Sequence, residues 1–276
     1  MTPTDTSPTP TPASDLPQAD ASSLVDSIEL ERQVKEVYRS VATEPHAPQH
    51  FEMGRGLALR LGYPESLLDF VPEAAVDSFA GVGYHHDLAA LEAGDRVLDL
   101  GSGSGTDVFC AAVAVGETGR AVGVDFTDAQ LARSTSLAES HDFTNVEFLE
   151  ARIDDLPFDD ESFDVVISNG VINLSPVKDR VFAEAARVLR SGGRLAISDI
   201  VSATPLKERT RRNTELWAAC IAGAIPAAAY LDALTAAGFA IATTRGNDYR
   251  FLSDRARDAC ETYGVVSKTV AARKQT

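Results

Sequence analysis

The feature that most constrains the fold of this chain is a short apolar strand that runs into a glycine-rich turn and then into a helix. Residues 97–100 read Val-Leu-Asp-Leu, and Gly101, Gly103 and Gly105 follow at alternate positions. Glycine lets the backbone turn tightly and lets a ligand approach without an intervening side chain. The amide groups at the start of the next helix favour a polar or anionic group. The segment therefore predicts a ligand-binding turn, with an ordinary strand-to-helix connection as the alternative.

Strands and helices alternate along the rest of the chain. Apolar runs predict strands at 96–100, 120–125, 146–149, 163–169, 193–199, 239–244 and 265–272. Helices are expected between most of them, at 107–115, 127–140 and 177–189. Short buried strands that alternate with helices indicate a parallel sheet covered on both faces. We therefore expect an α/β fold with a doubly wound, Rossmann-like, mostly parallel seven-stranded sheet.

Three further segments are expected around this sheet. Residues 1–23 are rich in Thr, Pro, Ser, Asp and Ala and predict a disordered tail, because they cannot bury enough apolar surface to offset the entropy of ordering. Apolar residues at helical spacing predict an N-terminal helical cap over 24–92. The sheet domain is then expected over 93–276, with a helical insertion on the substrate side at 203–237, after the fifth strand.

The charge balance bears on partners and location. The 276 residues include 41 Asp and Glu against 25 Lys and Arg, a formal net charge of -16. An acidic surface repels phosphates, so a nucleic acid partner is not expected. No apolar run reaches the ~18–20 residues that a membrane span needs. The first residues lack the pattern of a secretory signal, so the sequence predicts a cytoplasmic protein without a membrane partner.

Strong acidity also predicts a halophilic protein, because salt screens the repulsion between surface carboxylates. The melting temperature of the purified protein is therefore expected to rise between low and molar KCl. A melting temperature that stays constant or falls over that range would contradict this prediction.

Two acids at the ends of neighbouring strands sharpen the ligand prediction. Asp99 lies two residues before Gly101, and Asp125 ends the next strand. An anion at 99 suits an amino-acid ammonium group, and an acid at 125 can accept both hydroxyls of a ribose. Both positions belong to the crevice at the carboxyl ends of the strands, where such sheets bind ligands. A nicotinamide dinucleotide is the rival ligand, but its fingerprint places a glycine where this chain has Thr106.

Further segments follow the glycine turn in a specific order: Gly-Val-Asp-Phe at 123–126, Asp-Asp-Leu-Pro-Phe at 154–158, Ser-Phe-Asp-Val-Val at 162–166 and Leu-Arg-Ser-Gly-Gly at 189–193. In these segments the chain resembles the class I S-adenosylmethionine-dependent methyltransferases. The resemblance implies S-adenosyl-L-methionine as cofactor. It implies that Asp125 binds the ribose and that Phe126 lies beside the adenine. The methionine part would be held by Asp99 and by the glycine turn with Gly101, Ser102, Gly103 and Gly105.

Other residues are expected to complete the cofactor site. Thr127 is predicted to cap the helix that follows Phe126, and Asn169 ends the fourth strand. The family often places an acid for the adenine amino group two residues before Asp154, where this chain has Arg152. The resemblance therefore leaves Asp154 or the backbone at Ile153 to take that role.

A closer resemblance covers more of the chain. Residues 61–65 read Leu-Gly-Tyr-Pro-Glu, 167–176 read Ile-Ser-Asn-Gly-Val-Ile-Asn-Leu-Ser-Pro, and 216–224 read Leu-Trp-Ala-Ala-Cys-Ile-Ala-Gly-Ala. These segments are similar to those of the arsenite methyltransferases. That family binds trivalent arsenic through three cysteine thiolates, which are soft ligands for a soft centre. The resemblance implies a metalloid acceptor.

The chain departs from that family at the thiolates. Val82 and Gly170 stand at two of the three positions, and only Cys220 remains. One thiolate cannot make the two or three sulfur bonds that hold the metalloid. Cys110 is expected to be a buried core residue, and Cys260 lies on a late helix. The three cysteines match no zinc pattern, and no metal site is expected.

Side chains near the expected acceptor are Tyr84, His85 and Trp217. His85, or its neighbour His86, could act as a base or bind a polar acceptor. The alternative is that both are solvated loop histidines. Trp217 is expected to line or support the cap.

Three functions stay open at this point. The first is methyl transfer to a metalloid or soft thiol-bound acceptor, with Cys220 as the catalytic contact. The second is methyl transfer to a small organic acceptor in a pocket remodelled by Val82 and Gly170. The third is a noncatalytic module that binds S-adenosylmethionine.

Overall fold

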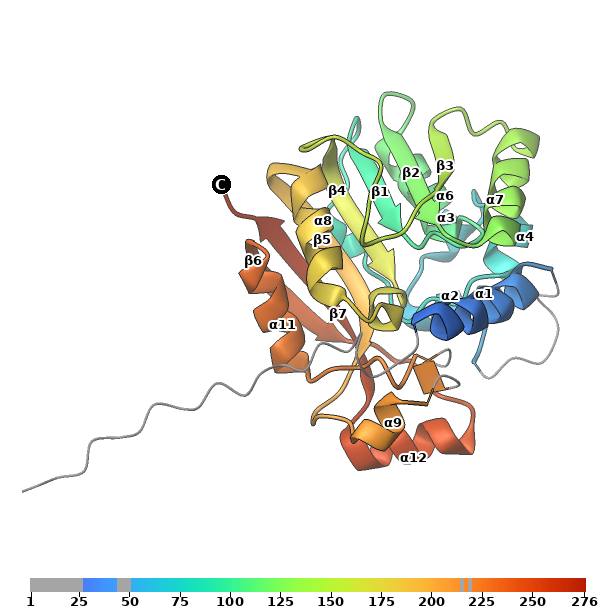
Figure 1. The fold of residues 1–276 in the computed structure, drawn as a ribbon. Coiled ribbons are helices and arrows are strands. Elements are labelled where there is room, and N and C mark those ends of the chain that lie inside the picture. Colours follow the sequence, from blue (N-terminus) through green and yellow to red (C-terminus); the bar gives the residue numbers. More distant parts are fainter. Residues whose placement is uncertain (1–26, 44–50, 214–215, 218–219) are drawn as a thin grey trace, which may run out of the picture.

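The computed structural model describes residues 27–43, 51–213, 216–217 and 220–276, so the predicted tail at 1–23 lies outside the described residues. In the described part, one sheet has the strand order β3-β2-β1-β4-β5-β7-β6 (Figure 1). The strands are β1 Arg96–Leu100, β2 Arg120–Asp125, β3 Val146–Glu150, β4 Phe163–Asn169, β5 Leu189–Val201, β6 Phe239–Gly246 and β7 Val266–Lys274. The pairs from β3 to β5 are parallel, and β7 is antiparallel to both β5 and β6. The mostly parallel, seven-stranded α/β fold is confirmed.

Alternation along the strands divides the core into two layers. Leu98 shares a buried cluster with Phe182 of α8 (Lys178–Val188) and with Tyr230 of α11 (Ala227–Ala236). Val97 belongs instead to the cluster that includes Val108 of α6 (Thr106–Val115). Successive strand residues point to opposite faces, so both faces must be covered by helices. This packing fixes β1 and leaves its carboxyl end free to present a site.

The residues before β1 form short helices. They are α1 Ser27–Thr43, α2 Gly54–Leu61, α3 Glu65–Leu68, α4 Glu73–Asp77 and α5 His86–Ala89. In Figure 1, α1 lies across the end of the sheet toward which the parallel strands point. It packs against α7, Asp128–Ser140. The N-terminal helices therefore cover the edge of the sheet where the sequence places Asp99 and Asp125.

The predicted helical insertion at 203–237 includes, among its described residues, one helix outside the sheet and one helix that packs on it. It contains α9, Glu208–Arg211, and α11, and α11 packs against β6 and α8. Because Tyr230 and Leu234 are buried in the main core, α11 covers the sheet rather than the predicted substrate side. Helix α12, Asp254–Tyr263, lies beside α9 at the lower end of Figure 1.

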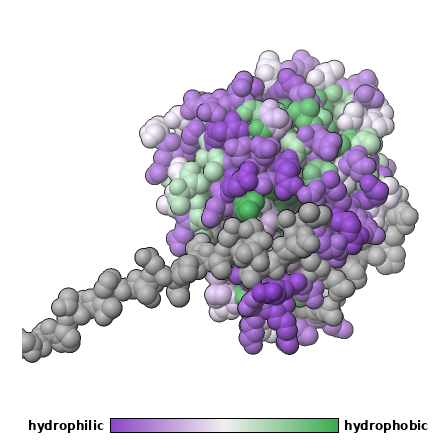
Figure 2. Space-filling model, viewed as in Figure 1, coloured by the Kyte–Doolittle hydropathy of each residue, from purple (hydrophilic) through white to green (hydrophobic). Residues whose placement is uncertain are grey.

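The face of the molecule that Figure 2 shows is mainly polar. Figure 2 shows one face on which hydrophilic residues dominate, with small apolar areas between them. None of the described helices has the length and apolar character that crossing a membrane requires.

Candidate active site

A cavity opens at the carboxyl ends of β1, β2 and β4, with about 820 Å³ of space that is partly open solvent. Its walls come from α1, from the segment 78–81, from the glycine turn and from the end of β2. It brings together most of the cofactor-site residues that the sequence proposes: Asp99, Gly101, Ser102, Gly103, Asp125, Phe126, Thr127, Ile153 and Asn169. The two acids at 99 and 125 thus face the same hollow.

The glycine turn combines positive φ angles with close contacts, and both favour glycine. Gly101 has φ +77°, and a Cβ there would lie 2.5 Å from the Val171 side chain. Gly105 has φ +94°, and its Cβ would lie 2.7 Å from the Phe148 ring. Residues with side chains rarely adopt such φ values. Gly105 is absent from the described cavity wall, so its place in the turn is to let the backbone pack against Phe148.

Asp125 ties the glycine turn to β2. One carboxylate oxygen accepts the Gly103 N–H at 2.9 Å, and the other accepts the Thr127 N–H at 2.8 Å. Burial raises the pKa of Asp125, although these backbone hydrogen bonds act to lower it. Thr127 is the N-cap residue of α7, as the sequence predicts, but its side chain makes no cap hydrogen bond. Asp125 binds the backbone of Thr127 instead.

Asp99 is a buried acid without a counter-ion in the described part of the chain. Its side chain is 3% exposed, and Oδ1 has no hydrogen-bond partner among the described residues. Burial, together with the neighbouring Asp107 and Asp125, raises the pKa of Asp99 well above its ordinary value. An isolated buried carboxylate is costly. The cavity therefore suits a ligand that brings a positive charge or a hydrogen-bond donor to Asp99.

Arg152 and Asp154 lie at a neighbouring hollow. Its wall shares Phe126 and Ile153 with the first cavity, so the two spaces adjoin. Arg152 Nε lies 3.1 Å from Asp154 Oδ1, and Arg152 Nη1 lies 2.7 Å from Glu31 Oε2. These ion pairs place Arg152 between α1 and the segment after β3.

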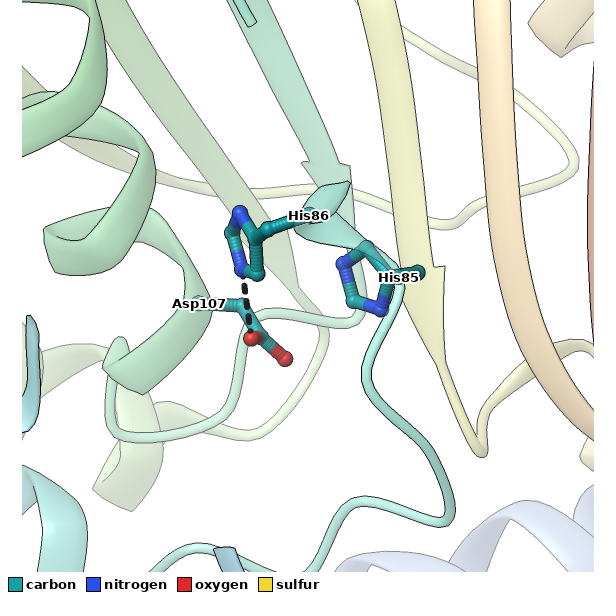
Figure 3. A group of neighbouring side chains, drawn as sticks. All are labelled: His85, His86 and Asp107. Atoms are coloured by element: carbon teal, nitrogen blue, oxygen red, sulfur yellow. Dashed lines mark hydrogen bonds and ion pairs between the residues drawn. The ribbon is translucent and has the colours of Figure 1, made fainter. Parts of the chain in front are cut away.

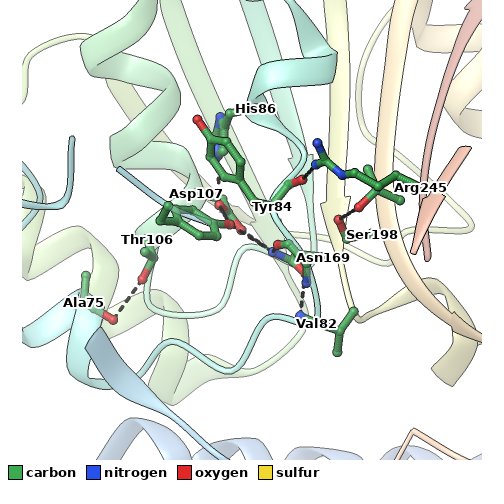
Figure 4. Close-up of polar contacts among 12 residues, drawn as sticks. Ala75, Val82, Tyr84, His86, Thr106, Asp107, Asn169, Ser198 and Arg245 are labelled. Atoms are coloured by element: carbon green, nitrogen blue, oxygen red, sulfur yellow. Dashed lines mark hydrogen bonds and ion pairs between the residues drawn. The ribbon is translucent and has the colours of Figure 1, made fainter. Parts of the chain in front are cut away.

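A hub of polar contacts around Asp107 was not anticipated from the sequence. Asp107, in the first turn of α6, accepts hydrogen bonds from the Tyr63 hydroxyl, from His86 Nε2 at 2.8 Å and from Asn169 Nδ2 at 3.1 Å (Figure 4). Burial acts to raise the pKa of Asp107, but the two neighbouring histidines and these hydrogen bonds hold it below its ordinary value. The one available signal was an acid directly after the glycine turn in an otherwise apolar helix.

Asn169 connects this hub to the segment 81–83. Its Oδ1 accepts the Val82 N–H at 2.8 Å, and its Nδ2 donates to Gly83 O at 2.9 Å (Figure 4). A Cβ on Gly81 would lie 2.5 Å from Asn169 Nδ2, so glycine is needed for this close approach. Asn169 thus positions the segment that forms part of the cavity wall.

Val82, Gly170 and Cys220, the three positions that the sequence resemblance assigns to thiolates, lie close together. A Cβ on Gly170 would lie 3.2 Å from Val82 Cγ1, and Cys220 Sγ lies 3.7 Å from Gly170 O. Cys220 Sγ is also 4.0 Å from the hydroxyl of Tyr38, which lines the cofactor cavity. Burial, followed by the charge of Asp199, raises the pKa of Cys220 to about 12. The residue is therefore a neutral thiol at neutral pH.

The remaining acceptor-side candidates are more buried than the sequence suggests. His85 is 0% exposed and His86 is 7% exposed, so the interpretation of solvated loop histidines is wrong. Burial lowers the pKa of His85 to about 3, and His85 is absent from the described wall of either cavity. Tyr84 is half-buried, and its ring centre lies 4.7 Å from that of Tyr63. Trp217 is buried and donates from Nε1 to Arg211 O at 2.6 Å, so it packs beneath α9.

The doubly wound sheet, the glycine turn and the two strand-end acids define the domain of a class I methyltransferase. A protein-family model described as a methyltransferase domain matches residues 91–256. The chain belongs to this family of S-adenosylmethionine-dependent methyltransferases and is related to the arsenite methyltransferases.

The relatives differ in how much of their length this chain covers. The arsenite methyltransferase of Halobacterium salinarum is 40% identical over 217 residues, which are 78% of this chain and 55% of that protein. The human arsenite methyltransferase is 39% identical over 138 residues, or 47% of this chain and 37% of that protein. The crystal structure of an arsenic(III) S-adenosylmethionine methyltransferase from Chlamydomonas reinhardtii has a TM-score of 0.60 and 30% identity, covering 82% of this chain and 75% of that one. The chain therefore spans about half or less of the length of these two curated relatives.

Proposed function

We propose that this protein is an S-adenosylmethionine-dependent methyltransferase that transfers a methyl group to a metalloid or soft thiol-bound acceptor. The observation that carries the proposal is that the cavity proposed for the cofactor lies next to Cys220. The cavity with Asp99 and Asp125 adjoins Tyr38, whose hydroxyl lies 4.0 Å from Cys220 Sγ. The proposed site of the methyl donor is therefore close to a sulfur atom, Cys220 Sγ, that could contact the acceptor.

The residues of the cavity fit the cofactor. Asp99 Oδ1 and Ser102 Oγ are buried polar atoms without a partner among the described residues, and both belong to the cavity wall. Asp99 would hold the ammonium group of the methionine part, and Asp125 would hold the ribose hydroxyls. Phe126 would lie beside the adenine. Asp154 and the backbone at Ile153 would bind the adenine edge at the adjoining hollow, with Arg152 holding Asp154 in place.

When bound, the cofactor supplies a sulfonium methyl group that an acceptor lone pair can displace in line. The chain's task is then to align the acceptor and exclude water, since correct orientation supplies much of the rate. Asn169 fixes the segment 81–83 through Val82 and Gly83. Helix α1 covers the cavity with Val34, Tyr38 and Val41. No general base is needed for a metalloid lone pair or a thiolate, and His85 is absent from the described wall of the cavity, in agreement with that.

A small organic acceptor is the second candidate, and a specific observation favours it. Val82 is apolar, Gly170 has no side chain, and Cys220 is protonated at neutral pH. These residues offer an apolar contact surface rather than a set of thiolates. A noncatalytic module that binds the cofactor is the third candidate. For partners and location we propose a small acceptor rather than a nucleic acid, and the cytoplasm, because the chain is acidic and carries three free cysteines.

Replacement of the one retained thiol separates the first two candidates. Cys220→Ser is expected to lower arsenite-dependent methylation at least about tenfold, because the soft contact to the acceptor is lost. Cofactor affinity should stay unchanged, because Cys220 lies beyond the cavity wall. The measurements are methyl transfer from labelled S-adenosylmethionine and calorimetry with S-adenosylhomocysteine.

Cys110→Ala is the matched control, since Cys110 is buried in a different cluster on α6. Arsenite turnover that is indifferent to Cys220→Ser would exclude the soft-contact proposal. Turnover of an organic acceptor without any arsenite methylation would support the second candidate. Tight cofactor binding without turnover of either would support the third.

A further inference from the structure

Two histidines and an acid form a buried cluster beside the proposed active site. His85, His86 and Asp107 are each less than a tenth exposed. One ligand atom from each residue can be chosen so that all three atoms lie within 4.8 Å of one another. Figure 3 shows the two imidazole rings beside the Asp107 carboxylate, with the chain of α5 on one side and α6 on the other. His85 immediately before α5, His86 in α5 and Asp107 in α6 thus bring three donor atoms close together.

Three of the four ring nitrogen atoms in the cluster have no hydrogen bond to a described residue. Both ring nitrogens of His85 and Nδ1 of His86 are buried and have no partner among the described residues. Burying a polar group without a partner costs about 1–3 kcal/mol in proteins, and His85 has two such atoms. The imidazole of His85 therefore has no partner among the described residues and can accept a ligand from outside the chain.

We propose that His85, His86 and Asp107 bind a divalent transition-metal ion of the zinc class. Two neutral imidazoles and one carboxylate are donors that zinc takes readily, whereas calcium and magnesium prefer oxygen ligands alone. Zinc lies about 2.0–2.2 Å from such ligands, so the donor atoms of a tetrahedral site are roughly 3.4 Å apart. The observed spacing requires side-chain movements of about an ångström. In the ion-bound form, the contact between His86 and Asp107 gives way to two metal bonds.

The surroundings of the cluster match those of a metal site. Ligating groups are commonly held by second hydrogen bonds that fix their orientation. Asp107 accepts such bonds from the Tyr63 hydroxyl and from Asn169 Nδ2. Asn169 Oδ1 in turn accepts the backbone N–H of Val82 at 2.8 Å. The bound ion would therefore fasten the segment that contains Val82 and His85 to the first turn of α6, independently of which acceptor is methylated.

Metal binding to the full-length, untagged protein tests the proposal without reference to activity. The protein is stripped with a chelator, dialysed against zinc, cobalt(II) or magnesium, and analysed for bound metal by mass spectrometry. We expect about one equivalent of zinc or cobalt and no retained magnesium. X-ray absorption of the zinc form should show a shell of nitrogen and oxygen with imidazole scattering. Less than about 0.1 equivalent of zinc, or a shell with sulfur from a cysteine, would overturn the proposal.

His85→Leu is the variant that separates a metal site from an unsatisfied histidine. It should weaken zinc binding at least about a hundredfold, because one of three protein ligands is lost. The exposed His141 supplies a control for adventitious surface binding, and His141→Ala should leave zinc affinity unchanged. Equal zinc affinity in wild type and His85→Leu would refute the site. If His85→Leu does not fold, the absorption spectrum of the wild-type protein decides.

Discussion

Asp99→Asn is expected to weaken the binding of S-adenosylhomocysteine by about 3 kcal/mol or more, a loss of at least roughly 150-fold. The carboxylate lies in the cavity wall with Oδ1 unpartnered among the described residues, so the cofactor's ammonium group would lose the carboxylate that we propose pairs with it. A buried charge left without its partner is strongly unfavourable. Isothermal calorimetry with the demethylated cofactor measures the effect, because this product keeps the ammonium group and is stable in solution.

The same substitution should stabilise the protein without ligand. The pKa of Asp99 is raised in the folded protein by burial and by the charges of Asp107 and Asp125. The stability associated with neutral Asp99 is therefore present below the unfolded pKa, near 3.8, and is lost as pH rises through the folded pKa. Asn cannot ionise, so the variant should have the higher free energy of unfolding at neutral pH, and the gain should shrink toward pH 3.8. A variant that loses stability and ligand affinity together would refute a cation-binding role for Asp99.

Asp125→Ala is expected to weaken cofactor binding by about 1–3 kcal/mol, or roughly 5- to 150-fold. Two effects combine in this loss. The ribose hydroxyls lose their acceptor, and the Gly103 and Thr127 N–H groups lose the carboxylate that accepts them at 2.9 and 2.8 Å. Calorimetry with S-adenosylhomocysteine measures the change.

A comparison of two ligands separates the roles of the two acids. Adenosine has the ribose but lacks the amino-acid group, so its affinity should fall in Asp125→Ala and stay unchanged in Asp99→Asn. Asp128→Asn is the matched control, because Asp128 is an exposed acid in the first turn of α7 that pairs with Arg39. Unchanged affinity of Asp125→Ala for both ligands would contradict the assignment of the ribose site.

Much of the fold follows from local patterns in the chain. The strands β1 to β7 lie close to the predicted positions. For the central strands β1, β2, β4 and β5 the reason is that a strand buried on both faces must be apolar along its length. The glycine turn is equally local, since positive φ at Gly101 and Gly105 is a property of single residues. The position of the two acids at 99 and 125 follows as well, because parallel neighbouring strands end at the same edge of the sheet.

The environment of each buried side chain does not follow from local patterns. The sequence suggests that His85 and His86 are either a base or loop histidines in solvent, but they lie under the cap beside Asp107. The α5 helix and the first turn of α6 are separated by the whole of β1, and only their packing brings these groups together. The raised pKa of Cys220 likewise depends on its burial and on Asp199, a strand residue distant in sequence.

The sequence alone determined the sheet, the turn and the positions of the strand-end acids, because each depends on a spacing of residues within one element. Only the tertiary structure decided which polar atoms are left without partners and which side chains meet across elements. The clearest instance is Asp107 with its neighbours Tyr63, the pair His85 and His86, and Asn169, which come from four separate segments of the chain. The burial of a polar side chain and the partners that it finds depend on how distant segments pack together. The spacing of residues within one segment therefore cannot predict them.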